Sequence, residues 1–308
     1  MSNALLAETT TVRSKLAELE ETGFTHLPDL VPPETLQSMQ HAFATRLKRM
    51  RWNDYDGYEK TEPFRHMVQD VLMLDQGFLD LALHPLVKSI LREYLGDGFA
   101  LVEAKGWLSL PTPKDFHGWH GDAWYDQAQI HEVPREVKLA FYLTDVKSGA
   151  FTYLKGTHHK THPRGYRNEE VSDIPKDQII EVLAPAGSGF LFDTSGIHRQ
   201  TTPILDPRQA IFLNYHDPRY PLQQEDIDYY RYHPLLLNAA YLGNLDHEDR
   251  KILGFGDKRH YSPAFERKSR DPAMHALLSN AYDSKLKLGR LSDRVQSRLR
   301  KQFARKSR

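Results

Sequence analysis

The chain has 308 residues, with 41 basic and 41 acidic side chains, so its formal net charge is zero. The absence of cysteine excludes disulfides and thiolate metal sites. Hydrophobic residues make up 40% of the chain, and no run approaches the roughly 20 apolar residues of a membrane span. The N-terminal residues do not resemble a signal peptide, so we expect a cytoplasmic protein with one large domain or two small ones.

The first 98 residues are predicted to form a mostly helical flank. Residues 11–21 and about 32–50 have helical spacing of apolar side chains, and a short strand is expected between them at 24–28. Residues 66–95 are also predicted to be helical, ending at Gly96.

Residues 99–217 are predicted to form a β core. Short runs rich in β-branched and aromatic residues alternate with turn formers. The expected strands cover 99–110, 137–144, 151–154, 179–183, 189–193, 198–202 and 209–215. Because no helix-length segment interrupts them, an antiparallel sandwich or barrel is favoured over a parallel sheet.

Residues 218–308 are predicted to be a C-terminal extension that ends in a basic amphipathic helix. Residues 284–308 hold ten Lys or Arg and one acid, which leaves 31 basic and 40 acidic residues for the rest. That acidic excess argues against nucleic-acid binding. The helix is compatible with docking on the acidic body, with a protein partner or with a membrane surface.

A candidate metal site begins with His120 and Asp122. Residues two apart in an extended segment point to the same side, so these side chains can face one ion. His198, on a later predicted strand, supplies a second imidazole. Two histidines and one carboxylate form a facial triad, which leaves three positions open on octahedral Fe(II).

Arg208 is a candidate anchor for a dicarboxylate. It lies ten residues after His198, across a Pro- and Asp-containing turn, at the start of the next predicted strand. A guanidinium binds a carboxylate through two parallel hydrogen bonds. A 2-oxo dicarboxylate would reach the metal at its keto end and Arg208 at the other.

The order of these motifs resembles the phytanoyl-CoA dioxygenase family. The matching motifs run from about residue 20 to 217: Gly23-Phe24, Trp119-His120-Gly121-Asp122, Thr144-Asp145 to Gly149, Gly156-Thr157-His158, Gly189 to Asp193 with His198, and Arg208. Lys155 stands where the family has proline, and Gln200 stands where relatives often have serine.

This resemblance implies a double-stranded β-helix, a jelly-roll of the cupin type, with helical flanks. It implies Fe(II) held by His120, Asp122 and His198, with 2-oxoglutarate and O2 as co-substrates. Arg208, Lys105 and Gln200 are the expected 2-oxoglutarate residues. The implied reaction hydroxylates or desaturates a small or medium organic metabolite and releases succinate and CO2.

Trp124 and Tyr125 follow the first two ligands and are candidate substrate-lining residues. Aromatic residues on strands more often belong to a core, so that alternative remains open. Two other functions also remain: a cupin-type metal-dependent isomerase or hydrolase that does not use 2-oxoglutarate, and a catalytically silent binding protein on the same scaffold.

Overall fold

The structure is a computed structural model of the chain. It describes residues 3–27, 29–49, 64–115, 118–122, 135–160, 174–220, 235–243 and 245–255, together with Ser284 and Leu288.

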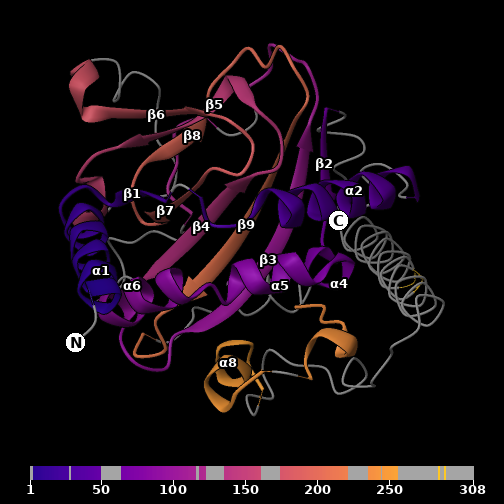
Figure 1. Cartoon of the computed structure of the whole chain (residues 1–308). Coiled ribbons are helices and arrows are strands. Elements are labelled where there is room, and N and C mark those ends of the chain that lie inside the picture. The colour runs from indigo at the N-terminus through magenta and orange to yellow at the C-terminus, as the bar shows by residue number, and fades with distance from the viewer. Residues whose placement is uncertain are drawn as a thin grey trace, which may run out of the picture.

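Two antiparallel sheets form the centre of the molecule (Figure 1). The six-stranded sheet has the order β1-β7-β4-β9-β3-β2, and the three-stranded sheet has the order β6-β5-β8. The strands are β1 (Phe24–Leu27), β2 (Arg65–Val68), β3 (Ala100–Ser109), β4 (Glu136–Tyr142), β5 (Val146–Leu154), β6 (Ile179–Ala184), β7 (Gly189–Asp193), β8 (His198–Gln200) and β9 (Arg208–His216). This is a jelly-roll core, which confirms the fold predicted from the sequence.

An aromatic layer from both sheets forms one part of the core. Tyr142, Phe190 and Phe192 of the large sheet pack with Phe151 and Tyr153 of β5, and all five side chains are buried. The rings of Phe151 and Phe192 lie 4.5 Å apart between centroids. Side chains on a strand alternate between the two faces, so the inner face of each strand meets the other sheet.

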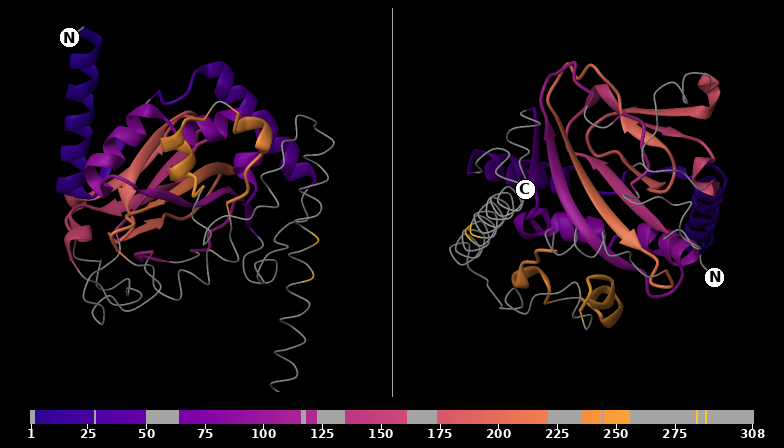
Figure 2. Two further views of the ribbon diagram at one scale, coloured as in Figure 1. Left: turned by 90° about the horizontal axis from the view of Figure 1, so that it is seen from below. Right: turned by 180° about the vertical axis from the view of Figure 1, so that it is seen from behind.

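Helices cover the outer face of the six-stranded sheet, as Figure 1 shows for α2, α5 and α6, and the view from behind in Figure 2 places β3, β4 and β9 in front of them. Their apolar side chains join those of the strands in a second, larger cluster. The helices are α1 (Asn3–Thr22), α2 (Pro33–Arg49), α4 (Val71–Leu74), α5 (Gln76–Ala82), α6 (Pro85–Leu95) and α8 (His247–Ile252), with short 3-10 helices at Thr157–His159, Lys176–Gln178 and Ala239–Tyr241.

Local sequence explains where α6 begins and ends. Pro85 occupies the first turn, where its missing N–H costs nothing. Gly96 follows the last residue with a φ of 88°, and its N–H donates to the carbonyl of Arg92. One face of α6 buries Val87, Ile90, Leu91, Tyr94 and Leu95 against the sheet.

The flank prediction needs one correction. Residues 66–68 are predicted to begin a helical region, but they belong to β2, which pairs with β3 from Arg65 opposite Ser109 to Val68 opposite Gly106. The N-terminal segment therefore contributes both edge strands, β1 and β2, to the large sheet. The rest of 66–95 is helical but divided into three short helices. In the part of the chain that is described, no helix has the length and apolar character to cross a membrane.

Candidate metal centre

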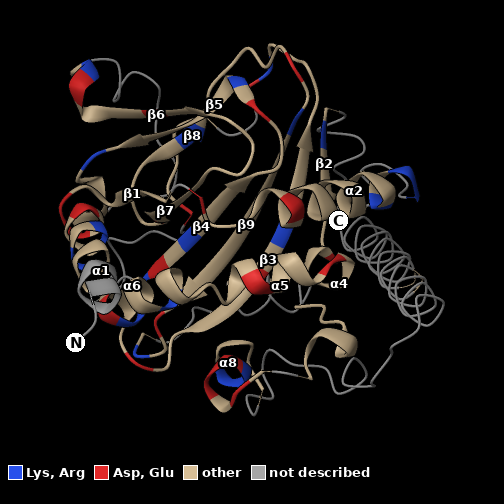
Figure 3. Ribbon diagram, viewed as in Figure 1, with Lys and Arg blue, Asp and Glu red and all other residues tan. Residues whose placement is uncertain are grey.

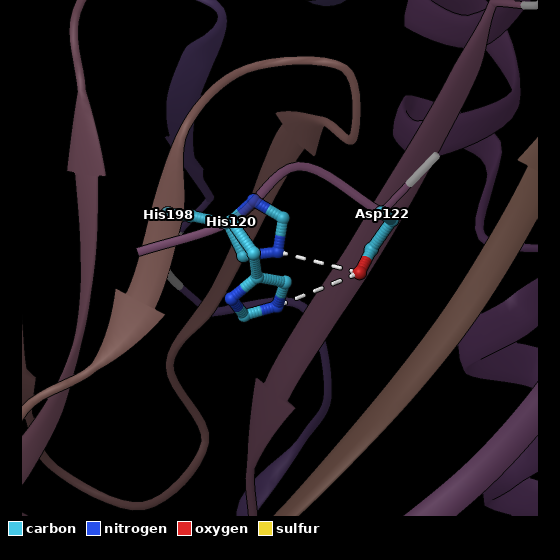
Figure 4. Close-up of side chains that lie close together, drawn as sticks. All are labelled: His120, Asp122 and His198. Atoms are coloured by element: carbon cyan, nitrogen blue, oxygen red, sulfur yellow. Dashed lines mark ion pairs between the residues drawn. The ribbon is translucent and has the colours of Figure 1, made fainter. Parts of the chain in front are cut away.

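His120, Asp122 and His198 converge at one end of the space between the sheets. Their ligand atoms lie within 4.8 Å of one another. Oδ1 of Asp122 lies 3.8 Å from Nε2 of His120 and 3.6 Å from Nε2 of His198. Figure 4 shows both imidazole rings directed toward this oxygen.

The hydrogen bonds of the two rings fix which nitrogen is available to a metal. Nδ1 of His120 donates to the carbonyl of Gly118, and Nδ1 of His198 donates to that of Gly196, each over 2.9 Å. A carbonyl can only accept, so Nδ1 carries the hydrogen and Nε2 keeps its lone pair. A histidine that binds a metal through one ring nitrogen usually donates the N–H of the other to a carbonyl, a carboxylate or water in the same way. The donor set therefore fits a divalent metal that accepts nitrogen and oxygen ligands.

The backbone also joins the ligands. The N–H groups and carbonyls of His120 and His198 exchange hydrogen bonds of 3.0 and 2.8 Å as an isolated β-bridge. The amide of Asp122 donates to the carbonyl of Thr194 over 2.9 Å. The turn from Asp193 to Gly196 thus contacts the segments that carry all three side chains.

Burial and charge keep both ligand types in metal-binding form near neutral pH. Burial, with His198 nearby, lowers the pKa of His120 to about 4, so its ring is neutral. Burial alone would raise the pKa of Asp122, but the ammonium of Lys138 and the two imidazoles hold it well below its ordinary value. The site therefore presents a neutral imidazole at His120 and a carboxylate at Asp122.

Lys105 lies on β3, near the candidate metal centre, and its Nζ donates to Oε1 of Glu103 over 2.5 Å. Burial lowers the pKa of Lys105 despite this acidic neighbour. Lys105 is thus placed among the charges near the metal centre, with Glu103 as a partner. A direct contact with 2-oxoglutarate stays a prediction for this residue.

Arg208 is buried, with 5% of its surface exposed. Its Nη1 donates to the carbonyl of Gly149 over 2.6 Å, whereas its buried Nε has no hydrogen-bond partner among the described residues. Buried guanidinium nitrogens are rarely left unpaired. A carboxylate would supply the missing acceptor.

Two further donors lie close to Arg208. Gln200 also approaches the Gly149 turn, because its Nε2 would lie 3.4 Å from a Cβ at Gly149. Ser109 is the cross-strand neighbour of Arg208, and such neighbours share one face of the sheet. The Gln200 amide nitrogen and the Ser109 hydroxyl are both buried without a hydrogen-bond partner in the described structure.

Sequence reasoning missed Lys138 and Ser109. Lys138 is a basic residue within the otherwise apolar run Val137 to Tyr142. A charged side chain at that position is the sequence signal that points to it. Ser109 carries no such signal, since its place beside Arg208 depends on strand register. Trp124, Tyr125 and the predicted C-terminal helix lie outside the described residues, except for Ser284 and Leu288 of that helix.

A jelly-roll with two histidines and an aspartate gathered between its sheets has the facial triad of non-haem iron oxygenases. The chain belongs to the phytanoyl-CoA dioxygenase family, because the family model described as Phytanoyl-CoA dioxygenase (PhyH) matches residues 19–201, more than half of its length. This confirms the resemblance found in the motifs and makes the chain an iron- and 2-oxoglutarate-dependent enzyme by class.

Solved structures show the same fold at low identity. SnoK, a non-heme alpha ketoglutarate dependent carbocyclase from nogalamycin biosynthesis, is 18% identical with a TM-score of 0.54, over 67% of this chain and 83% of its own. The epimerase SnoN, in complex with Fe3+, alpha ketoglutarate and nogalamycin RO, is 17% identical with a TM-score of 0.52, over 68% and 84%. HygX from Streptomyces hygroscopicus, with nickel and 2-oxoglutarate bound, is 20% identical with a TM-score of 0.50, over 68% and 88%. The comparison with curated proteins gives no match.

Proposed function

We propose that this protein is an Fe(II)- and 2-oxoglutarate-dependent dioxygenase that hydroxylates or desaturates a small or medium organic metabolite. In the hydroxylation, 2-oxoglutarate, O2 and a substrate C–H bond give succinate, CO2 and an alcohol. The observation that carries the proposal is the convergence of His120, Asp122 and His198 in a jelly-roll that also buries an incompletely paired Arg208.

The three converging side chains would hold the iron. Adjacent ligands around such an ion, at bond lengths of about 2.1 Å, lie about 3 Å apart. The observed separations of 3.6 and 3.8 Å are slightly wider, and they enclose a space of ionic size. The iron, when bound, supplies the oxidation chemistry, whereas the protein supplies position and exclusion of water.

Arg208 would bind the carboxylate of 2-oxoglutarate that is remote from the metal. Its Nε offers one donor to this carboxylate, and the Gln200 amide and the Ser109 hydroxyl offer further donors. Lys105, paired with Glu103, would add positive charge beside the co-substrate. A buried cationic site of this kind favours a dianion over a monocarboxylate.

Two features of the proposal rest on sequence alone. Trp124 and Tyr125 are proposed to line the substrate pocket, and the C-terminal basic helix is proposed to contact protein or a membrane surface. A cytoplasmic location likewise stays a prediction. Since two structural relatives are described as an epimerase and a carbocyclase, the outcome at the substrate carbon has to be measured directly.

The test begins with anaerobic binding of Fe(II) and then 2-oxoglutarate, measured by calorimetry. A metabolite panel is then scored by succinate release and product mass. The native protein should bind one Fe(II) and release succinate only with iron, O2 and 2-oxoglutarate. The Asp122→Ala variant should lose iron binding while it remains folded. A native protein that binds no divalent metal at this site would refute the proposal.

The alternative is a cupin-type isomerase or hydrolase that uses the same metal without 2-oxoglutarate. This alternative function gives Arg208 no role at the site, so the buried, incompletely paired guanidinium of Arg208 favours the dioxygenase. Turnover of a panel compound that needs metal but neither 2-oxoglutarate nor O2 would identify this alternative instead.

A further inference from the structure

The two carboxylate oxygens of Asp122 have different surroundings. Oδ1 is directed at the two imidazoles, 3.8 and 3.6 Å from their Nε2 atoms. Oδ2 accepts a hydrogen bond of 2.5 Å from Nζ of Lys138, which lies on strand β4. One oxygen therefore faces the metal position and the other is held by an ammonium group.

Lys138 is itself held in place. Its side chain is 13% exposed, and its Nζ lies 4.0 Å from Oε2 of Glu103, a residue on β3 that is 2% exposed. Strand register explains this contact, because Lys138 and Glu103 both pair with Asn214 of the intervening strand β9. Cross-strand neighbours point to the same face, so both side chains extend from one row across three strands.

The charges near the metal position alternate in sign. Asp122 contacts Lys138, Lys138 approaches Glu103, and Glu103 accepts a hydrogen bond from Lys105. Figure 3 shows the basic positions on β3 and β4 within otherwise largely uncharged strands. Buried charges are costly unless they are paired. Two acids and two bases in contact offset one another's charge.

We propose that Lys138 is a positioning residue that holds Oδ2 of Asp122 away from the metal, so that the carboxylate offers a single oxygen. This inference rests on the proposed metal site. Neither the triad motif nor the family match assigns a role to this lysine.

The number of oxygens offered matters for the reaction. A six-coordinate ion with two imidazoles and one carboxylate oxygen keeps three positions open. If 2-oxoglutarate takes two of them through its keto acid, one remains for O2. A carboxylate bound through both oxygens would fill that last position, so control of Oδ2 protects the co-substrate positions.

Charge supports the same assignment. An ammonium and a metal cation repel each other, which places the lysine on the oxygen that faces away from the ion. Glu103 offsets part of this repulsion because it lies on the far side of Lys138.

The test compares Lys138→Met, which keeps the length of the side chain and removes the donor, with Lys138→Arg, which keeps the donor and the charge. The matched control is Lys88→Met. Lys88 forms an equally short ion pair with Asp249, its side chain is 15% exposed, and it joins α6 to α8 away from the triad. Fe(II) affinity, the visible absorption spectrum of the Co(II)-loaded protein and the 2-oxoglutarate affinity of that loaded protein are measured for each folded variant.

Without Lys138, Oδ2 of Asp122 is free to become a second carboxylate ligand and to fill a position that 2-oxoglutarate would take. We expect a changed Co(II) spectrum and several-fold weaker 2-oxoglutarate binding for Lys138→Met, smaller changes for Lys138→Arg, and a native spectrum and 2-oxoglutarate affinity for Lys88→Met. A folded Lys138→Met variant with a native Co(II) spectrum and native 2-oxoglutarate affinity would overturn the inference.

Two further outcomes are separable. If Lys138→Met does not fold, the double variant Lys138→Met/Glu103→Gln removes one acid together with one base, which restores the charge balance of the cluster, and it should show the same changed Co(II) spectrum. A native Co(II) spectrum in that double variant would also overturn the inference. If the native protein binds neither Fe(II) nor Co(II), the failure belongs to the proposed function and not to the role of Lys138.

Discussion

The hydroxyl of Tyr94 donates a hydrogen bond of 2.8 Å to Oδ2 of Asp193, and both residues are buried. Tyr94 belongs to α6, whereas Asp193 ends β7 and begins the turn that contacts the metal-binding segments. Oδ1 of the same carboxylate accepts from the amide and the hydroxyl of Ser195. A helix on the outer face of the sheet is thereby linked to the position of the metal ligands.

Replacement of Tyr94 by phenylalanine should therefore affect both stability and metal affinity. Loss of a partner from a buried carboxylate costs about 1–3 kcal/mol, and the loosened turn should weaken Ni(II) binding several-fold. Urea unfolding and calorimetric titration measure the two effects. Tyr215→Phe is the control, because the Tyr215 hydroxyl donates to the carbonyl of Ala82, away from the triad. Equal metal affinities for the two variants would contradict the link.

Arg208→Met should raise the 2-oxoglutarate concentration needed for half-maximal succinate release while leaving Fe(II) affinity unchanged. Removing one partner of a buried charged pair costs about 2–5 kcal/mol, which corresponds to a loss of roughly 30-fold or more in affinity. Arg208→Lys should recover only part of it, since an ammonium lacks the two-point fork. An unaltered 2-oxoglutarate requirement in Arg208→Met would show that the anchor lies elsewhere.

Gly196 is a position where a side chain does not fit. A Cβ there would lie 1.8 Å from the Tyr153 hydroxyl, and the glycine carbonyl holds Nδ1 of His198. Gly196→Ala should destabilise the protein by about 1–3 kcal/mol through overpacking and weaken metal binding. Gly243→Ala is the matched control, because nothing lies within 4 Å of its Cβ position. Similar melting temperatures for the two variants would argue against this packing.

His216 should contribute a pH-dependent part of the stability. Burial lowers its pKa, but the hydrogen bond and charge of Glu136 outweigh burial and raise the pKa above the ordinary 6.5. A raised folded pKa adds stability that is fully present below about pH 6.5 and is lost as the pH rises through the folded pKa. The difference in unfolding free energy between the native protein and His216→Gln should therefore shrink from pH 6 toward about pH 8.5. A constant difference would contradict the shift.

The strands of the core could be predicted because each is a short apolar run bounded by turn residues, and all seven expected runs overlap observed strands. The error at β2 has a physical cause. Arg65 to Val68 have no local β signal, and their conformation is decided by pairing with β3, about 40 residues later. Local β-propensity does not reveal a strand whose formation depends on pairing with a distant segment.

The triad could be predicted because His120 and Asp122 are only two residues apart, and because His198 lies on a strand that the sequence itself indicates. The role we propose for Lys138 could not be predicted in the same way. Its contact with Asp122 depends on how residues 118–122 are placed in the fold. Its contact with Glu103 depends on the register of three strands, β3, β9 and β4. Ser109 reaches Arg208 through the same register. Such neighbours become visible only in the folded chain.

The paired backbones of His120 and His198 have a consequence for the metal-free enzyme. Their reciprocal hydrogen bonds join backbone groups and leave the ligand nitrogens out, so the two rings should keep their spacing when the metal leaves. Binding then does not have to supply the ordering free energy that a folding-coupled zinc finger requires. Chelation should accordingly yield an inactive but folded protein whose function returns on simple addition of the ion, with no refolding step between.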